Sequence, residues 1–226
     1  TGAITGTPTA TSSATTYTVT VTDANSATAT ATFSLLVNGP VTATQAIASK
    51  TLTQNAMAAS FTPVTGAGGT GAVTYAISPA LPSGLSISSS TGAITGTPTA
   101  TVTAATYTVT VTDVVNGTAN ATFSLTVNSA TTATQAVAST TLTKNAAATA
   151  FTPVTGGGGT PPYVYSVSPA LPAGLSISSS TGAITGTPTA TSVATNYTVT
   201  VTDANGSVAS AIFSLTVGNS VTATQI

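Results

Sequence analysis

Charged residues are almost absent from this sequence. Its 226 residues include two lysines and three aspartates but no arginine, histidine or glutamate, so charged residues make up 2% and the formal net charge is −1. Binding to nucleic acid or to an anionic membrane surface needs clustered Lys and Arg. We therefore expect no nucleic-acid partner. Thr or Ser interrupts every apolar stretch before it reaches the ~18 residues of a membrane-spanning helix, so direct membrane insertion is not expected either.

Cysteine and histidine are both missing, which removes much catalytic and metal-binding chemistry. The chain has no disulfide, no Cys- or His-liganded metal site and no Ser–His–Asp or Cys–His arrangement. The carboxylates of Asp23, Asp113 and Asp203 are a domain length apart, so one unit offers neither a catalytic carboxylate pair nor the several oxygens of a calcium site. We predict no catalytic residue, no metal and no cofactor, and we interpret the aspartates as turn residues.

The sequence is instead built mainly from Thr, Ala, Ser, Val and Gly. Thr and Val are β-branched and favour strands. They alternate in stretches such as YTVTVT at residues 107–112, where every second residue is apolar. This period of two is typical of a strand with one buried face. The positive mean hydropathy of +0.43 is therefore interpreted as the mark of strands with apolar inner faces, not of a membrane segment.

The chain also repeats itself with a fixed period. The phrase TGAITGTPTAT begins at Thr1, Thr91 and Thr181, so successive copies are 90 residues apart. The same register aligns Tyr17, Tyr107 and Tyr197, then Asp23, Asp113 and Asp203, then Phe33, Phe123 and Phe213. A unit of this length can form a domain with its own core, so we predict separate domains arranged like beads on a string.

The middle unit divides into seven predicted strands separated by turn signals. They lie at residues 44–55, 58–64, 73–78, 85–88, 93–97, 107–113 and 119–127. Residues 65–72 form a Gly-rich segment that we expect to be a mobile loop, and Gly84 is expected to adopt a positive φ in a turn. Alternation places the following residues on one buried face: Tyr75, Ile77, Leu85, Ile87, Tyr107, Val109, Val111, Phe123, Leu125 and Val127. This pattern predicts a two-layer antiparallel β-sandwich.

A longer motif points to a family. The segment LPSGLSISSSTGAITGTPTATVTAATYTVTVTD, continued by FSLTV, runs from Leu81 to Val127. It resembles the immunoglobulin-like repeat of large bacterial surface and secreted proteins, which is related to cadherin-like repeats. The resemblance implies an all-β fold of tandem, seven-stranded Ig-like sandwiches, an extracellular or cell-surface location, and no reaction.

The period also predicts where the repeats begin and end. We expect residues 1–40 to be the C-terminal half of one repeat, residues 41–130 and 131–220 to be complete repeats, and residues 221–226 to start another. Half of a sandwich exposes its core face and unpaired strand edges. Two explanations stay open: the sequence is a window on a longer array, or strands of another chain complete the half-domain.

The nearly uncharged surface raises the question of what keeps it soluble. Outward faces of Thr, Ser and Ala invite association unless they are covered. Covering by glycans is one expectation, because the hydroxyl-dense Ser and Thr faces can accept O-linked sugars. N-x-S/T tripeptides also occur at Asn116, Asn120, Asn196 and Asn205, of which Asn116 and Asn205 are the preferred candidates in a hairpin turn. Association of copies into a fibre is the other.

The leading functional hypothesis is a non-catalytic extracellular stalk, spacer or filament subunit, whose partners are neighbouring repeats or copies of itself. The alternative is an adhesion module that binds carbohydrate or protein through its loops. The absence of Trp weakens that alternative. Tyr163, which stands where the previous repeat has Val73, is its candidate loop contact. A third possibility, an accessory domain of an enzyme, would need a catalytic neighbour outside this sequence.

Overall fold

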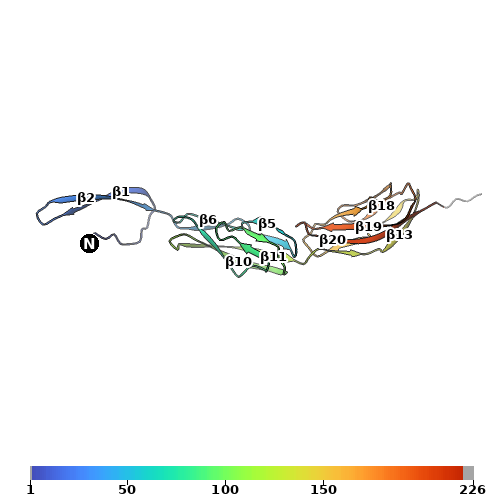
Figure 1. Cartoon of the computed structure of the whole chain (residues 1–226), viewed down its shortest axis with the longest axis horizontal. Helices are drawn as coiled ribbons and strands as arrows, with labels where there is room; N and C mark the ends of the chain where they lie inside the picture. Colours follow the sequence, from blue (N-terminus) through green and yellow to red (C-terminus); the bar gives the residue numbers. More distant parts are fainter. Residues whose placement is uncertain (1, 221–226) are drawn as a thin grey trace, which may run out of the picture.

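A computed structural model describes residues 2–220 of the chain. The described residues contain strands and turns and no helix. Figure 1 shows an elongated molecule in which a two-stranded hairpin is followed by two sandwiches in a row. We call these the half-repeat (β1–β2), repeat 1 (β3–β11) and repeat 2 (β12–β20). The half-repeat hairpin consists of β1 (Ser12–Thr22) and β2 (Thr28–Val37), which pair antiparallel.

Repeats 1 and 2 have the same element order and the same sheets. Each has a four-stranded sheet, a three-stranded sheet and a two-stranded ladder. In repeat 1 their orders are β4-β11-β10-β7, β5-β9-β8 and β3-β6. The strands of repeat 1 are β3 (Thr42–Gln45), β4 (Ser49–Thr53), β5 (Ala58–Phe61), β6 (Val64–Ala67), β7 (Thr74–Ser78), β8 (Leu85–Ile87), β9 (Ile94–Gly96), β10 (Val102–Thr112) and β11 (Thr118–Asn128). Those of repeat 2 are β12 (Thr132–Gln135), β13 (Ser139–Thr143), β14 (Ala148–Phe151), β15 (Val154–Gly157), β16 (Val164–Ser168), β17 (Leu175–Ile177), β18 (Ile184–Gly186), β19 (Ser192–Thr202) and β20 (Val208–Gly218).

Each complete repeat therefore has nine strands where the sequence predicts seven, because two predicted strands are each divided. The predicted segment 44–55 is divided because its first residues belong to β3, which ends at Gln45 and pairs with β6. The chain then enters the other sheet, where β4 pairs with β11. The segment 58–64 is broken at Pro63, which has no N–H to donate to a ladder. The Pro63 carbonyl instead accepts the N–H groups of Ala46 and Ile47 at 2.8 and 3.1 Å.

One pairing also departs from the predicted antiparallel arrangement. Strand β4 runs parallel to β11, with Ser49 opposite Ser124 and Thr53 opposite Asn128, and β13 pairs with β20 in the same way. The other strand pairs of the described residues are antiparallel. The parallel pair brings the end of β4 beside the end of β11, at the pole where repeat 1 meets repeat 2.

The predicted inner faces are the cores of the two complete repeats. Val109, Val111 and Leu125 are fully buried, and Tyr107 is 4% exposed. In repeat 1 the Phe123 ring stacks on Tyr107 with centroids 5.7 Å apart and meets Phe61 edge-on at 6.3 Å. Aromatic pairs of these geometries add to the stabilisation from apolar burial. The alternation of Thr with Val thus correctly identified which side chains face inward.

The half-repeat exposes the face that the complete repeats bury. Tyr17 is 44% exposed and Val21 67%, whereas their counterparts Tyr107 and Val111 are 4% and 0% exposed. This exposure is the one predicted for half of a sandwich. In the complete repeats this face is covered by the opposite layer, which includes β5, β8 and β9, whereas the described residues of the half-repeat form no strand of that layer.

Gly84 has the positive φ that the sequence predicts for its turn. Its φ is +90°, and the Leu85 N–H closes the turn on the Pro82 carbonyl at 3.1 Å. A Cβ at this position would lie 1.9 Å from the Thr97 carbonyl oxygen. The turn therefore needs glycine for two reasons: the backbone conformation and the close approach of another backbone segment.

We predict that Gly84→Ala destabilises repeat 1 much more than Gly206→Ala destabilises repeat 2. Gly206 also has a positive φ of +80°, but no atom lies within 4 Å of the position of an added Cβ. Gly206→Ala should therefore cost about 1 kcal/mol of backbone strain, and Gly84→Ala about 2 kcal/mol more because of the clash. Chemical denaturation of both variants measures the difference, and equal losses would contradict this explanation.

Candidate functional site

Each repeat carries its aspartate at the start of a hairpin turn between the two longest strands. In Asp23, Asp113 and Asp203 the Oδ1 atom accepts the backbone N–H groups of the residues two and four positions later, at distances between 2.7 and 3.1 Å. The interpretation of these residues as turn residues is confirmed. Asx-type bonding of this kind fixes the turn locally.

The second carboxylate oxygen has a role that the sequence did not reveal. In repeat 1 the Thr70 N–H donates to Asp113 Oδ2 at 2.8 Å, and in repeat 2 the Thr160 N–H donates to Asp203 Oδ2 at the same distance. Thr70 and Thr160 belong to the Gly-rich segments that we expected to be mobile loops. These segments are instead hydrogen-bonded to the hairpin turn, and in repeat 2 the Ala204 N–H also donates to the Thr160 carbonyl at 2.8 Å.

Repeat 1 contributes a buried hydroxyl to the same carboxylate. Thr53, the last residue of β4, donates its hydroxyl to Asp203 Oδ2 at 2.5 Å and is only 1% exposed. The parallel pairing of β4 with β11 brings Thr53 to this pole, where the next residue, Gln54, donates its N–H to the Asn128 carbonyl at 2.9 Å. A single carboxylate oxygen is thus bonded by groups from two successive domains.

Two asparagine side chains complete this junction, which we define as Thr53, Asn128, Thr160, Asp203 and Asn205. The Thr160 hydroxyl accepts Nδ2 of Asn128 at 3.1 Å and Nδ2 of Asn205 at 2.9 Å. It lies 3.0 Å from the Thr53 hydroxyl, which also accepts from Asn205 at 3.1 Å. Because the Thr53 proton goes to Asp203, Thr160 donates to Thr53. The donors therefore form a directed chain that ends on the carboxylate.

Hydrogen bonds at the junction also set the ionisation of the aspartates. Burial alone raises the pKa of Asp203, but the hydrogen bonds from Thr53, Thr160, Ser207 and Asn205 favour the ionised form, so the pKa lies below its ordinary value. The pKa of Asp113 is also lowered, chiefly by the Thr70 N–H. Asp203 is therefore an anion at neutral pH, stabilised by neutral donors in place of a counter-ion.

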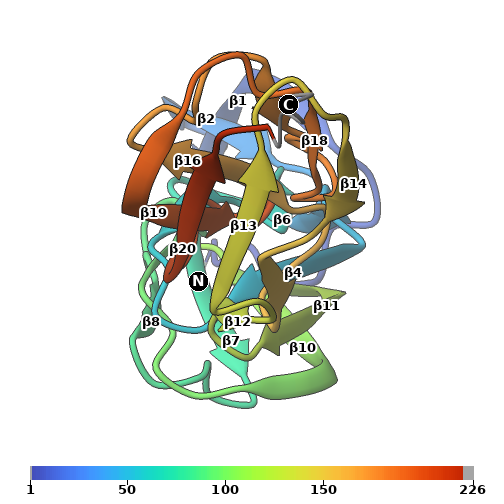
Figure 2. The ribbon, with the colours of Figure 1, turned by 90° about the vertical axis from the view of Figure 1, so that its right-hand side faces the viewer.

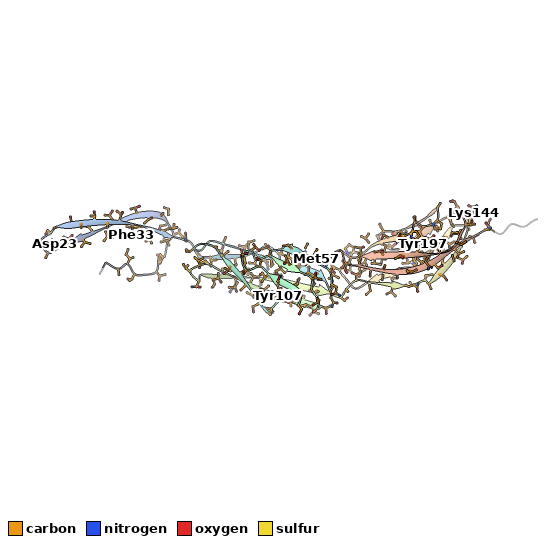
Figure 3. All side chains as sticks on the ribbon, viewed as in Figure 1. Asp23, Phe33, Met57, Tyr107, Lys144 and Tyr197 are labelled. Carbon is orange, nitrogen blue, oxygen red and sulfur yellow. The ribbon has the colours of Figure 1, made fainter. Side chains whose placement is uncertain are left out.

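Two open grooves flank the junction, with volumes of about 250 and 470 Å³. Met57, which is 81% exposed, and Asn205 line both; Figure 3 shows Met57 beside the boundary of the two repeats. Within residues 2–220 no cluster of three His, Cys, Asp or Glu residues could hold a metal ion. The chemistry present here is neutral donors around one satisfied carboxylate, an arrangement suited to joining domains.

The two glycosylation candidates occupy different surroundings. Asn116 is exposed in the hairpin turn of repeat 1, with a φ of +66°. Asn205 is half-buried, and its Nδ2 donates to Thr53, Thr160 and the Thr51 carbonyl. A glycan on Asn205 would require breaking these bonds. Modification of either residue, like that of the exposed Asn120 and Asn196, stays a prediction.

Tyr163 is half-buried and packs against the core of repeat 2. Its hydroxyl donates to the Gly158 carbonyl in the Gly-rich segment of the same repeat. The side chain thus supports its own loop; a contact with a ligand, for which the sequence made it a candidate, stays a prediction.

Sequence reasoning missed Thr53, Thr160 and Asn128 because ordinary strand and linker chemistry explains each of them. The available signal was positional. Each of the three residues has an identical residue 90 positions away: Thr143 for Thr53, Thr70 for Thr160 and Asn38 for Asn128. None of them belongs to the predicted inward-facing residues, so core packing does not explain the repetition.

We predict that Thr53→Val destabilises the junction while Thr143→Val does not. Thr143 is the equivalent residue of repeat 2 and is exposed. Valine at position 53 keeps the shape but leaves buried polar partners unsatisfied, which should cost about 1–3 kcal/mol, whereas the change at the exposed position should stay within about 0.5 kcal/mol. Denaturant unfolding curves of the two variants provide the measurement, and indistinguishable midpoints would count against a buried hydrogen-bond role.

We also predict a pH dependence from Asp203. A carboxyl whose pKa is lower in the folded than in the unfolded state stabilises the fold fully above the unfolded value near ~4, and the stabilisation decreases as the pH falls through the folded value. The free energy of unfolding should therefore be level between about pH 5 and 7 and should decline in more acidic solution. Asp203→Asn should be less stable at pH 7 and should show a shallower acidic decline; an unchanged slope would contradict this assignment.

Comparisons with known proteins give matches to solved structures and to one family model. The chain matches solved structures of tandem domains: the I-band fragment I67–I69 from titin (15% identity, 91% of this chain and 75% of that one, TM-score 0.42), human protocadherin-24 EC1-2 (15% identity, 82% and 100%, TM-score 0.37) and Drosophila OTK extracellular domains 3–5 (15% identity, 91% and 71%, TM-score 0.41). No curated protein matches the sequence. A helix able to cross a membrane is not found in residues 2–220.

The sequence itself matches one family model three times in succession. The model is described as "Putative Ig domain", and its matches cover residues 1–38, 39–128 and 129–218. The two full-length matches have the predicted 90-residue period and begin two residues before the repeat starts expected from the sequence. Together the three matches span nearly the whole chain. The chain therefore belongs to this Ig-domain family and is a tandem array of immunoglobulin-like domains.

Proposed function

We propose that the chain is a non-catalytic extracellular spacer, a stalk or filament segment that holds its neighbours at a fixed distance. The observation that carries the proposal is the junction. A buried carboxylate with hydroxyl and amide partners from both repeats joins repeat 1 to repeat 2 end to end. A junction fixed by several directional hydrogen bonds suits a protein that must keep its domains at a constant distance and orientation.

The composition supports a spacer over a module that captures charged partners. Asp113 and Asp203 are buried, so Asp23 and the two lysines are the charged side chains that are not buried. Within residues 2–220 the exposed outer faces carry mainly hydroxyl groups, methyl groups and amides. Such a surface offers little for electrostatic recognition of a soluble partner.

The location and the covering of the surface belong to the same proposal. A chain made of hydroxyl-rich sheets suits the outside of a cell, where glycans on exposed Thr, Ser or Asn116 would keep neighbouring copies apart. The adhesion alternative receives less support, because Tyr163 is half-buried against its own repeat.

We predict that the purified chain is extended in solution and that its length does not depend on salt. The junction contains no ion pair, so screening has nothing to weaken, and the maximum dimension from small-angle X-ray scattering should be the same at ionic strengths from about 0.02 to 1 M. Thr53→Val should broaden the distance distribution, with Thr143→Val as the matched control. A compact particle at any ionic strength would contradict a spacer.

Antibodies raised against the chain test the location. On unpermeabilised cells that produce the protein, immunogold particles should label the surface or filaments that leave it. Labelling that requires permeabilisation would overturn an extracellular role.

Intact mass spectrometry of the native protein then tests the glycan covering: added hexose masses support it, and an unmodified mass contradicts it.

A further inference from the structure

Two hairpin turns of the chain contain asparagine followed directly by glycine, at residues 116–117 between β10 and β11 and at residues 205–206 between β19 and β20. Glycine has no Cβ, so its backbone nitrogen is open to approach by the asparagine side chain. Asparagine in such a pair can lose its amide when that nitrogen attacks the side-chain carbon, and asparagine is for this reason a thermolabile residue. The two turns hold their asparagines in different surroundings.

The amide of Asn205 is bonded across the boundary between the repeats. Its Nδ2 donates to the Thr51 carbonyl at 3.3 Å and the Thr53 hydroxyl at 3.1 Å, both in repeat 1, and to the Thr160 hydroxyl at 2.9 Å. Figure 2 views the molecule from the end of repeat 2, with β13 and β20 in front and β4 and β11 of repeat 1 behind them. Attack by the Gly206 nitrogen requires the side chain to rotate and its amide nitrogen to leave, and both changes disrupt these bonds.

Asn116 is exposed and is free of this constraint. Its turn is closed by backbone N–H groups that donate to Asp113, so the side-chain amide takes no part in it. The attacking nitrogen is hydrogen-bonded in both turns: the Gly117 N–H donates to Asp113 Oδ1 at 2.7 Å and the Gly206 N–H to the Asp203 carbonyl at 3.1 Å. The bonds that depend on the junction are therefore those of the side-chain amide in repeat 2.

We propose that Asn205 is a deamidation site whose reaction is controlled by the junction and whose product releases it. When the side chain leaves repeat 1, the Gly206 nitrogen attacks Asn205 Cγ and closes a five-membered succinimide ring. The proton of that nitrogen passes through water to the amide nitrogen, whose bond to Cγ breaks and which leaves as ammonia. Water then opens the ring, giving its hydroxyl to one ring carbonyl carbon and a proton to the ring nitrogen, and leaves aspartate or its β-linked isomer.

The product cannot rebuild the junction. A carboxylate at position 205 accepts hydrogen bonds but cannot donate to the Thr51 carbonyl. It also places a second anion beside Asp203, and like charges in one site oppose each other's ionisation. The β-linked isomer in addition lengthens the backbone of the turn by one atom. Separation of the repeats, which is reversible in itself, thus becomes permanent in each molecule that reacts. This inference goes beyond the spacer function and does not depend on it.

Peptide mapping by mass spectrometry during incubation in mildly alkaline buffer measures both asparagines in the same sample. In denaturant Asn116 and Asn205 should react at similar rates, whereas in the native chain Asn205 should react about tenfold or more slower than in denaturant. Thr53→Val should raise the native rate at Asn205 about tenfold and leave that at Asn116 unchanged. Thr143→Val and the conservative Thr53→Ser should keep the slow rate. Gly206→Ala should remove most of the Asn205 product.

The effect of the product is measured with Asn205→Asp, which reproduces the α-linked form. Its distance distribution from small-angle X-ray scattering should broaden, as that of Thr53→Val does. Asn116→Asp is the matched control, because it makes the same chemical change in a turn whose asparagine amide holds no other repeat, and its distribution should match that of the unaltered chain.

Equal rates at Asn205 in native and denatured chain would overturn control by the junction, and this comparison needs no variant to fold. An unchanged rate in Thr53→Val, or an equal rise at Asn116, would do the same. An unaltered distance distribution for Asn205→Asp would overturn release of the junction. Each of these results leaves an extended, surface-located spacer standing, whereas the spacer fails on a compact particle or an intracellular location.

Discussion

The structure depends on satisfying a buried carboxylate in a protein that has almost no ions. Asp203 has no cation beside it, so its charge must be balanced by neutral donors, and these come from its own turn, from the Gly-rich segment and from the preceding repeat. One anion thereby ties three separate pieces of chain together. Removing any one donor leaves a buried charge short of partners, which is why the joint is specific although the repeats share few other polar contacts.

The sandwich around this anion follows from side-chain alternation. The long strands of the complete repeats place Val, Leu or an aromatic residue inward and mostly Thr or Ser outward, and closing two layers over the inward residues removes them from water. The hairpin turn that starts with aspartate is then held at the pole of the sandwich, where the longest strands reverse direction. The core thus places the carboxylate, and the carboxylate in turn places the next domain.

Much of the fold could be predicted from the sequence, because period and alternation are local properties. The 90-residue copies, the inward set from Tyr107 to Val127 and the glycine turn at Gly84 all follow from such patterns. The division of the first strand, the parallel pairing of β4 and the partners of Asp203 Oδ2 could not, since they depend on which sheet a segment joins. Thr53 has nothing in its neighbourhood in the sequence to distinguish it from the other outward threonines; only the crossing of its strand brings it to the junction.

The parallel pair has a mechanical consequence. Strand β4 lies near the beginning of repeat 1 and β11 at its end, and the two run in the same direction, joined from Ser49–Ser124 to Thr53–Asn128. Tension applied at the two ends of the repeat pulls these strands past each other along their length. The backbone bonds between them are then loaded in shear and must yield together, whereas bonds pulled apart one after another, like a zipper, would give way at lower force.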